Sequence, residues 1–393
     1  MRITGVRTVV AGNPWKNWVF ALVDTDEGLI GLGEGSLNGF GVTVQAAIGD
    51  LAPLVVGEDP TRIEWLGRRM QRDLYSDGGQ IHRAAQAAIE IACWDILGQS
   101  LNVPIWAMIG GQVRDRVRAY ANGWYRTERT PEAFAIAAKE AVARGYTALK
   151  FDPFGAAWRQ MDRSELALSI DLVDAVRSAV GPHIDVLIEG HSRFSVAQAI
   201  EVAERLVPAA PTWFEEPVRH DRITAVAEVA ARSPIPIATG ESFHTLGEFV
   251  ELGCAGTVAF WQPEPAHLGG ISPTKAVFGI AEAFDAVVAP HQAGGPVATA
   301  VCLHLAAASP THYIQEHFDS YNEPWEKDLV SWHPELTKDG FLPIPTGPGL
   351  GLTLDLDEVA RHPGGLQNFL PIFQDGWERR APRSGSTGPV SGT

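Results

Sequence analysis

The sequence predicts a parallel (β/α) barrel preceded by a separate α+β domain. Two observations carry this prediction: strand-like runs followed by helical stretches fill residues 1–115, and short apolar runs alternate with helical stretches from about residue 117 onward. Strands that precede helices without alternation are typical of an α+β domain, whereas βα alternation is typical of a parallel sheet. The length of 393 residues is sufficient for both domains.

The first 115 residues open with predicted strands and continue with predicted helices. Residues 25–28 read as a hairpin turn, because Gly28 can adopt the positive φ that such a turn requires. The helices are recognised by apolar residues at helical spacing. We expect strands at residues 3–10, 18–24 and 29–34, and helices at residues 44–56, 60–75 and 82–100.

The barrel is expected over residues 116–320, where apolar runs recur at regular intervals. An open doubly wound sheet is the alternative, but such sheets usually carry a glycine-rich phosphate loop after the first strand, and this sequence shows none. The eight predicted strands are residues 118–122, 148–151, 185–188, 212–214, 235–238, 258–261, 286–289 and 313–315.

The C-terminal region is rich in Pro, Gly and Trp. We expect residues 321–383 to fold back onto the N-terminal domain, with one more strand at residues 352–356. Residues 384–393 are polar and rich in Gly and Ser, so we expect a disordered tail.

Charge and composition exclude several classes of function. Lys and Arg number 31 and Asp and Glu number 47, giving a net charge of −16, which disfavours binding to nucleic acid or to anionic membranes. The 3 cysteines are far apart and none lies in a C-x-x-C arrangement, which favours a reducing compartment. No apolar run resembles a signal peptide or a membrane span, so a cytoplasmic location is expected.

Acidic side chains end three successive strands of the predicted barrel. Glu189 ends the third strand, Glu215 and Glu216 end the fourth, and Glu241 follows the fifth. The carboxyl ends of barrel strands meet at one mouth, and closely spaced carboxylates there cannot all stay ionised and unpaired. A hard divalent cation such as Mg²⁺ would satisfy them. Solvated acids at helix N-termini are the alternative, which the common register of the three disfavours.

Further round the predicted mouth, a carboxylate follows one strand and an imidazole follows the next. Glu264 comes after the sixth strand and His291 after the seventh. A neighbouring carboxylate would fix the tautomer of the imidazole and raise its basicity, as a general base requires. Glu316 ends the eighth strand and is expected to be an electrophile or hydrogen-bond partner, with a rim ion pair as the alternative.

Basic groups flank the predicted metal site on the other side. Lys150 and Asp152 occupy alternate positions after the second strand and therefore share a face, and His191 follows Glu189 by two residues. Lys150 could bind a substrate carboxylate, act as an electrophile or pair with Asp152. A metal flanked by bases predicts removal of a proton α to a carboxylate, with His291 as the base.

These residues stand in motifs that resemble the enolase superfamily, specifically its mandelate racemase branch. The motifs occur in order within residues 1–360, as GLGEG, AAIEIACWDILGQ, FEEP, ATGES, QPEPAHLGG and APHQAGG. The resemblance implies an α+β capping domain over a modified (β/α)₇β barrel. It also implies one Mg²⁺ per subunit held by Glu189, Glu215 and Glu241, and a homo-oligomer, either a dimer or an octamer.

Two departures from the branch carry information. Asp152 stands where racemases of the branch carry a second lysine, which disfavours racemisation of the mandelate type. His191 resembles a histidine of the acid sugar dehydratases that act on galactonate or mannonate, where it protonates the departing 3-hydroxyl. Glu264 replaces the usual Asp of the His–Asp pair, and we expect the extra methylene to be tolerated.

The resemblance therefore implies a Mg²⁺-dependent dehydratase that converts a small sugar acid, an aldonate or an aldarate, to a 2-keto-3-deoxy acid. An isomerase on the same scaffold, either an epimerase or racemase or a sugar-lactone cycloisomerase, is the alternative. A binding module without activity is a third possibility, which the complete ligand set disfavours. Loops at residues 13–17 and 37–43 are expected to close over the mouth. The expected substrate contacts are Asp152, Trp15, Lys16, Asn38 and Trp124, the last from the run YANGWYR.

Overall fold

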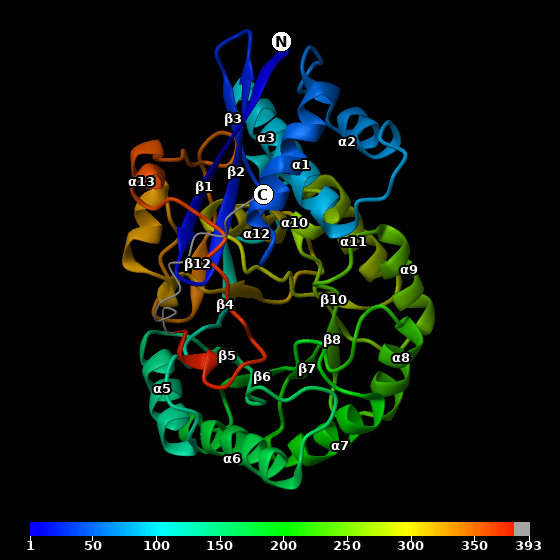
Figure 1. The fold of residues 1–393 in the computed structure, drawn as a ribbon, viewed down its shortest axis with the longest axis vertical. Helices are drawn as coiled ribbons and strands as arrows, with labels where there is room; N and C mark the ends of the chain where they lie inside the picture. The colour runs from blue at the N-terminus through cyan, green and yellow to red at the C-terminus, as the bar shows by residue number, and fades with distance from the viewer. Residues whose placement is uncertain (381–393) are drawn as a thin grey trace, which may run out of the picture.

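The computed structural model describes residues 1–380 and begins with an antiparallel sheet (Figure 1). Strands β1 (Ile3–Asn13), β2 (Lys16–Thr25) and β3 (Ile30–Glu34) form this sheet in sequence order. Helices α1 (Gly41–Val55), α2 (Ile63–Arg72), α3 (Gly79–Leu101) and the short α4 (Ile105–Met108) follow. The predicted meander followed by helices is confirmed, and Gly28 has a φ of 83° in the turn between β2 and β3.

A glycine stripe on β3 lets helix α3 lie directly against the sheet. A Cβ atom on Gly31, Gly33 or Gly35 would lie 2.1, 1.9 or 2.1 Å from the carbonyl oxygens of α3 residues one turn apart. Any side chain at these positions would push the helix away. The motif GLGEG is therefore required by the close approach of two backbones.

Residues 116–317 form the predicted barrel, with parallel strands inside and helices outside (Figure 1). The strands are β4 (Arg116–Ala121), β5 (Ala148–Phe151), β6 (Asp185–Glu189), β7 (Trp213–Glu215), β8 (Ile237–Thr239), β9 (Phe260–Trp261), β10 (Val287–Val288) and β11 (Gln315–His317). The outer helices are α5 (Pro131–Ala143), α6 (Arg163–Val180), α7 (Val196–Leu206), α8 (Ile223–Arg232), α9 (Leu246–Ala255), α11 (Ile271–Ala283) and α12 (Pro296–Ala307). All eight predicted barrel strands are confirmed, with ends that differ by at most two residues.

The sheet curves until its two ends meet. Its order runs from β10 through β9, β8, β7, β6, β5 and β4 to β11, and a bridge between Val288 and His312 joins the remaining edges. An outer helix follows each strand except β11 within the described residues, which confirms the (β/α)₇β arrangement. Inward-facing side chains such as Tyr120, Leu187 and Trp213 form a buried cluster that fills the barrel.

The strand predicted at residues 352–356 is wrong. Leu354 makes an isolated bridge to Val330, and Leu356 begins helix α13 (Leu356–Arg361). The side chain of Asp355 accepts a hydrogen bond of 2.9 Å from the backbone N–H of Glu358. This helix cap outweighs the alternating apolar pattern that suggested a strand.

The rest of the C-terminal region contacts both parts of the molecule. Strand β12 (Phe341–Pro343) pairs antiparallel with β4, and helix α13 contacts β1. Within the barrel region, the short helix α10 (Pro265–Leu268) follows β9 and contacts α3. Residues 362–380, named here the C-terminal strap, run beside β1 and then along the barrel (Figure 1). The tail expected at residues 384–393 lies outside the described residues. Within residues 1–380, no helix has the length and apolar character needed to cross a membrane.

Candidate active site

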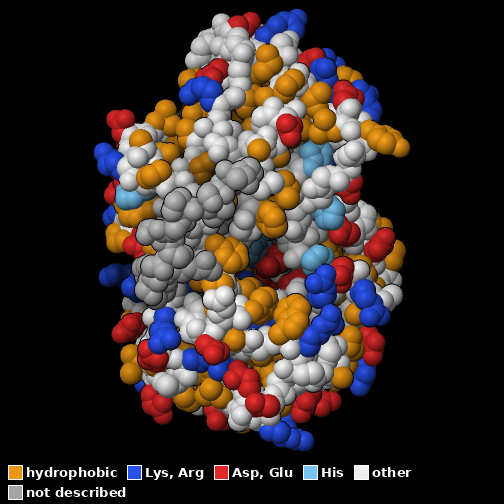
Figure 2. Space-filling view, viewed as in Figure 1, with side chains coloured by type: hydrophobic (Ala, Val, Ile, Leu, Met, Phe, Trp, Pro, Cys, Tyr) orange, Lys and Arg blue, Asp and Glu red, His pale blue; other side chains and the backbone are white. Residues whose placement is uncertain are grey.

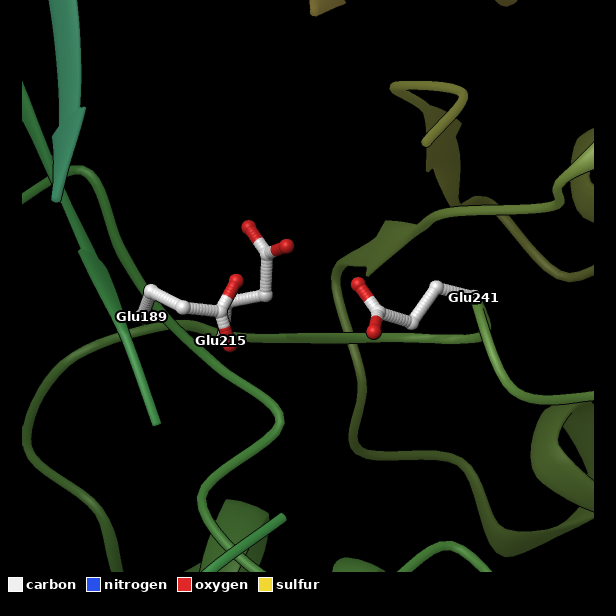
Figure 3. A group of neighbouring side chains, drawn as sticks. All are labelled: Glu189, Glu215 and Glu241. Carbon is white, nitrogen blue, oxygen red and sulfur yellow. The ribbon is translucent and has the colours of Figure 1, made fainter. Parts of the chain in front are cut away.

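Three carboxylates converge at the carboxyl ends of neighbouring barrel strands. Glu189 and Glu215 end β6 and β7 and are paired in register, and Glu241 lies just beyond β8. One oxygen atom from each lies within 4.8 Å of the others. Figure 3 shows the carboxylate of Glu241 pointing across a gap toward those of Glu189 and Glu215. The structure therefore brings these three side chains together, as the sequence predicts.

The chemistry of this donor set fits a hard divalent cation. Glu189 and Glu215 are buried, and burial, followed by the charge of Glu189, raises the pKa of Glu215 to about 8. Ionised carboxylates that lie this close together and are shielded from water repel one another unless a positive charge lies between them. A few carboxylate oxygens, with coordination positions left for water and substrate, suit Mg²⁺.

Lys150 supplies positive charge to the same carboxylates from β5. Its Nζ atom lies 3.2 Å from Oε2 of Glu189 and 2.9 Å from Oε1 of Glu316, and it donates a hydrogen bond to Glu215. Burial acts to lower the pKa of Lys150, but these carboxylates raise it well above its usual value, so the ammonium stays charged. The pairing with Asp152, one of the alternatives for Lys150, is not what the structure shows.

His291 and Glu264 form an imidazole–carboxylate pair beside Glu241. Nδ1 of His291 lies 2.9 Å from Oε2 of Glu264, and Nε2 lies 3.3 Å from Oε2 of Glu241. The longer side chain of Glu264 thus reaches the imidazole, while its other oxygen accepts a hydrogen bond from the N–H of Ala266 at 3.2 Å. Burial opposes protonation of His291, yet the charges of Glu241 and Glu316 raise its pKa to about 10.

A second imidazole–carboxylate pair lies at the opposite end of the carboxylate cluster. Nδ1 of His191 lies 2.6 Å from Oδ2 of Asp152, and the backbone N–H of His191 donates to Glu189 at 2.7 Å. Asp152 is fully buried and also pairs with Arg193. Asp152 was expected to contact substrate, but its oxygens are used to hold His191 and Arg193.

The backbone beside this second pair is in an uncommon conformation. His191, Ser192 and Glu216 have φ values of 46°, 56° and 40°, which place three non-glycine residues in the left-handed region. Glu216 holds the turn together: it accepts hydrogen bonds from Oγ of Ser192 at 2.5 Å and from the N–H of Gly240 at 3.1 Å. Left-handed residues of this kind cluster at functional sites, where surrounding contacts maintain them. Glu216 is therefore a structural brace and not a fourth member of the cluster.

Six of these side chains face one cavity of about 230 Å³, named here the barrel-mouth cavity: Lys150, Glu189, His191, Glu241, Glu264 and His291. Figure 2 shows acidic and histidine side chains inside this hollow and hydrophobic side chains around it. Trp15, Lys16 and Asn38 reach the cavity from the N-terminal domain, as expected. Trp124 is buried behind the wall, where its indole N–H donates to the Lys150 carbonyl at 2.8 Å, and the neighbouring Tyr125 lines the cavity instead.

Several lining residues escaped the sequence prediction. His267 stands in the quoted motif QPEPAHLGG, so a signal for it was present; its Nδ1 lies 2.6 Å from the Glu241 carbonyl oxygen, and burial lowers its pKa. Asn122 follows β4 and donates to Glu316 at 2.7 Å. The C-terminal strap adds residues that no local pattern could place at the barrel mouth. These are Leu370, Ile372, Trp377 and Arg380.

Comparison with known proteins matches both parts of the chain to one superfamily. Residues 133–359 match the family described as enolase C-terminal domain-like. Residues 6–110 match the N-terminal domain of mandelate racemase/muconate lactonizing enzymes. Both matches agree with the division into an α+β part and a barrel part described above.

Curated relatives include sugar acid dehydratases. The D-gluconate dehydratase of Thermoproteus tenax is 35% identical over 347 residues, covering 87% of this chain and 69% of that protein. The D-galactonate dehydratase of Xanthomonas oryzae pv. oryzae (strain PXO99A) is 34% identical over 371 residues, covering 92% of this chain and 94% of that protein.

Solved structures agree over nearly the whole chain. The mandelate racemase/muconate lactonizing enzyme from Jannaschia sp. CCS1 has a TM-score of 0.86 and 34% identity, covering 93% of this chain and 98% of that one. The corresponding enzyme from Sulfitobacter sp. has a TM-score of 0.87 and 34% identity, covering 93% and 96%. The chain therefore belongs to the mandelate racemase/muconate lactonizing enzyme family of the enolase superfamily.

Proposed function

We propose that this protein is a Mg²⁺-dependent dehydratase of a small sugar acid, which it converts to a 2-keto-3-deoxy acid with release of water. One observation carries the proposal: two histidines, His291 paired with Glu264 and His191 paired with the buried Asp152, face one cavity from opposite ends of the carboxylate cluster. Dehydration needs both a base that removes a proton and an acid that protonates a leaving hydroxyl.

The carboxylate end of the substrate belongs at the floor of the cavity. Glu189, Glu215 and Glu241 would hold Mg²⁺, which when bound supplies the positive charge that stabilises an enediolate. The ammonium of Lys150 lies against two of these side chains and places further positive charge beside the developing oxyanion.

His291 removes the proton on C2. Glu264 accepts the hydrogen bond from Nδ1–H, so that the lone pair of Nε2 faces the cavity. The negative charge of Glu241 raises the pKa of His291. A cation bound by Glu241 would offset that charge and so favour the neutral imidazole that a base requires.

His191 completes the elimination. Its Nδ1 is directed at Asp152, which leaves Nε2 to donate a proton to the 3-hydroxyl as the C3–O bond breaks. The products of this step are water and an enol, and the enol tautomerises to the 2-keto acid without a further reactant. The names of the dehydratase relatives, which act on D-gluconate and D-galactonate, support the same reaction class.

Racemisation or epimerisation is less well supported. It requires a second base that reaches C2 from the face opposite His291. Asp152, which occupies the position of the second lysine of racemases, is engaged by His191 and Arg193. The expectation of a dimer or octamer stays a prediction that light scattering after size-exclusion chromatography tests.

Two variants and one isotope experiment test the proposal. The enzyme is incubated with Mg²⁺ and a panel of aldonic and aldaric acids in D₂O, and mass spectrometry follows loss of one water and incorporation of deuterium at C2. His291→Asn should abolish both exchange and product. His191→Asn should retain exchange and lose most of the product. Product formation by the His291 variant, or a product that has kept its water, would overturn the assignment.

A further inference from the structure

The barrel-mouth cavity has an outer part that the proposed reaction does not use. Phe318 lies two residues beyond Glu316 and lines the cavity further out. Two cations lie against its ring: Nζ of Lys16 at 5.0 Å from the ring centre and the guanidinium carbon of Arg380 at 5.2 Å. Both cations come from segments outside the barrel, one from the β1–β2 hairpin and one from the C-terminal strap.

Arg380 is buried in this outer part without a carboxylate partner. Only 6% of its surface is exposed, and its Nε has no hydrogen-bond partner. Within residues 1–380, no carboxylate forms an ion pair with it; Glu326, whose charge acts on it, accepts a hydrogen bond from Asn13 at 2.8 Å. The Tyr125 side chain is its neutral hydrogen-bonding neighbour. A buried guanidinium in this state is an uncompensated charge that a bound anion would stabilise.

Hydrogen bonds anchor the C-terminal strap, which carries Arg380, near its start and near its end. Near its start, Asn17 exchanges hydrogen bonds of 2.9 and 3.0 Å with the backbone of Gly365. Near its end, the indole N–H of Trp377 donates to the Gly155 carbonyl at 3.1 Å. The guanidinium itself rests on bare backbone, since a Cβ on Gly123 would lie 2.9 Å from Nη1 of Arg380. The cation is therefore held in place before any ligand arrives.

We propose that Arg380 binds a second carboxylate at the far end of the substrate, so that the preferred sugar acid is an aldarate, a dicarboxylate. This inference rests on the proposed function, because it assigns the distal end of the same substrate. The planar guanidinium fork matches a carboxylate through paired hydrogen bonds, and Lys16 adds positive potential nearby. An aldonate would offer a hydroxymethyl group here and leave the guanidinium without its counter-ion.

Matched pairs of substrates test the proposal directly. Glucarate and gluconate differ only at the distal carbon, as do galactarate and galactonate, so each pair isolates the second carboxylate. For the pair with the accepted stereochemistry, wild-type kcat/KM should be at least about tenfold higher for the diacid. Arg380→Gln should lower kcat/KM for the diacid by about 10- to 100-fold and change the value for the monoacid by less than about threefold.

The neighbouring arginine provides the matched control. Arg379 is half exposed and pairs with Glu128 at 2.9 Å on the outside of the strap, so Arg379→Gln should leave both kcat/KM values unchanged. Binding gives a readout without turnover: in the His291→Asn background, calorimetry should show that Arg380→Gln weakens diacid binding by a similar factor and spares the monoacid.

The outcomes separate this inference from the function on which it rests. Dehydration of aldonates with no preference for aldarates, or equal losses for both acids in Arg380→Gln, overturns the distal-carboxylate assignment and leaves the dehydratase intact. A sugar acid phosphorylated at its distal end that outperforms the matched aldarate also overturns it. Absence of dehydration with every acid overturns both proposals together.

Discussion

Acidic side chains at the active site have two kinds of partner. Glu189, Glu215 and Glu241 face one another and need a cation between them. Glu264 and Asp152 each face an imidazole nitrogen, at 2.9 and 2.6 Å. The first group binds charge, whereas the second directs which ring nitrogen of a histidine carries the proton.

Replacing each directing carboxylate by its amide should separate the two half-reactions. Glu264→Gln should reduce both C2 deuterium exchange and product formation by about 10²-fold or more, because His291 loses the group that fixes its tautomer. Asp152→Asn should reduce product formation by a similar factor and leave exchange near the wild-type rate. Proton exchange by NMR and product by mass spectrometry measure the two rates on the same samples.

Arg193 complicates the second variant, because it loses its buried carboxylate partner in Asp152→Asn. We expect the free energy of unfolding to fall by about 3 kcal/mol, which urea denaturation measures. A folded Asp152→Asn protein that has lost exchange and product equally would show that Asp152 does not act through His191 alone.

At the scale of elements, acids of the N-terminal domain cap helices of the barrel. Helix α11 has no side-chain cap of its own, and Glu90 of α3 accepts hydrogen bonds of 2.8 Å from the N–H groups of Ile271 and Ser272. Glu34, in the motif GLGEG, accepts from the N–H of Ala298 at 2.9 Å and caps α12 in the same way. The domains are thus joined through helix N-termini, where a carboxylate is favoured by the helix dipole.

This cap requires a glycine at its centre. Gly270 has a φ of 120°, and a Cβ there would lie 2.1 Å from Oε2 of Glu90. Gly270→Ala should lower the free energy of unfolding by about 2 kcal/mol or more, through backbone strain and loss of the cap. Urea denaturation monitored by circular dichroism measures the change.

Gly279 provides the control in the same helix, since it is exposed and a Cβ there meets nothing within 4 Å. Gly279→Ala should raise the free energy of unfolding by about 1 kcal/mol through helix propensity. Equal effects of the two substitutions would contradict the account of the α3–α11 junction.

The same junction should make stability depend on pH. Burial raises the pKa of Glu90 to about 7, although hydrogen bonds from Ser272, Ile271 and Trp94 act in the opposite direction. Since the folded state holds this proton more tightly than the unfolded state, stability is largest below about pH 4.5 and is lost as pH rises through 7. The full difference from this one group is about 3 kcal/mol.

Glu90→Gln should remove this dependence. Urea denaturation of both proteins from pH 5.5 to 8.5 should give a free-energy difference that is largest at the acidic end and shrinks toward the alkaline end. Other titrating groups contribute equally to both proteins and cancel in the difference. A difference that stays constant with pH would show that Glu90 keeps the same charge throughout.

At the scale of the whole molecule, the three glutamates come from the ends of the neighbouring barrel strands β6, β7 and β8, which are far apart in the sequence. Mg²⁺ at a hundredfold excess over its Kd should stabilise the fold by about 2.7 kcal/mol, because only the folded chain brings Glu189, Glu215 and Glu241 together. Differential scanning calorimetry with Mg²⁺ and with a chelator measures the rise in Tm. Glu241→Gln should reduce that rise, and an unchanged Tm on addition of Mg²⁺ would contradict the assigned ligand set.

Net charge also has a different meaning at this scale. The chain carries a formal charge of −16, which by itself would repel an anionic substrate. The barrel-mouth cavity is lined by Lys150, Lys16 and Arg380 as well as by acidic side chains, whose charge the cation that the glutamates would hold offsets. Local placement of charge, rather than the total, decides whether a sugar acid can enter.

The sequence by itself determined the features that depend on local periodicity and on strand ends. Short apolar runs located every barrel strand. Because parallel barrel strands all end at one mouth, polar residues at the ends of neighbouring strands are expected to lie close together. Glu189, Glu215, Glu241, Glu264 and His291 were therefore predictable as one group. The strand expected at residues 352–356 failed because the Asp355 cap favours a helix there.

Only the tertiary structure decided which groups face substrate and which stand behind it. Asp152 and Trp124 lie next to the site in sequence, yet one holds His191 and the other binds the backbone of β5. Arg380 is far from every motif in the sequence, but the strap carries it to the cavity through hydrogen bonds to the β1–β2 hairpin. The position of a residue at a strand end indicates which way its side chain points. Contacts between segments that are distant in the sequence depend on packing, which no local sequence pattern predicts.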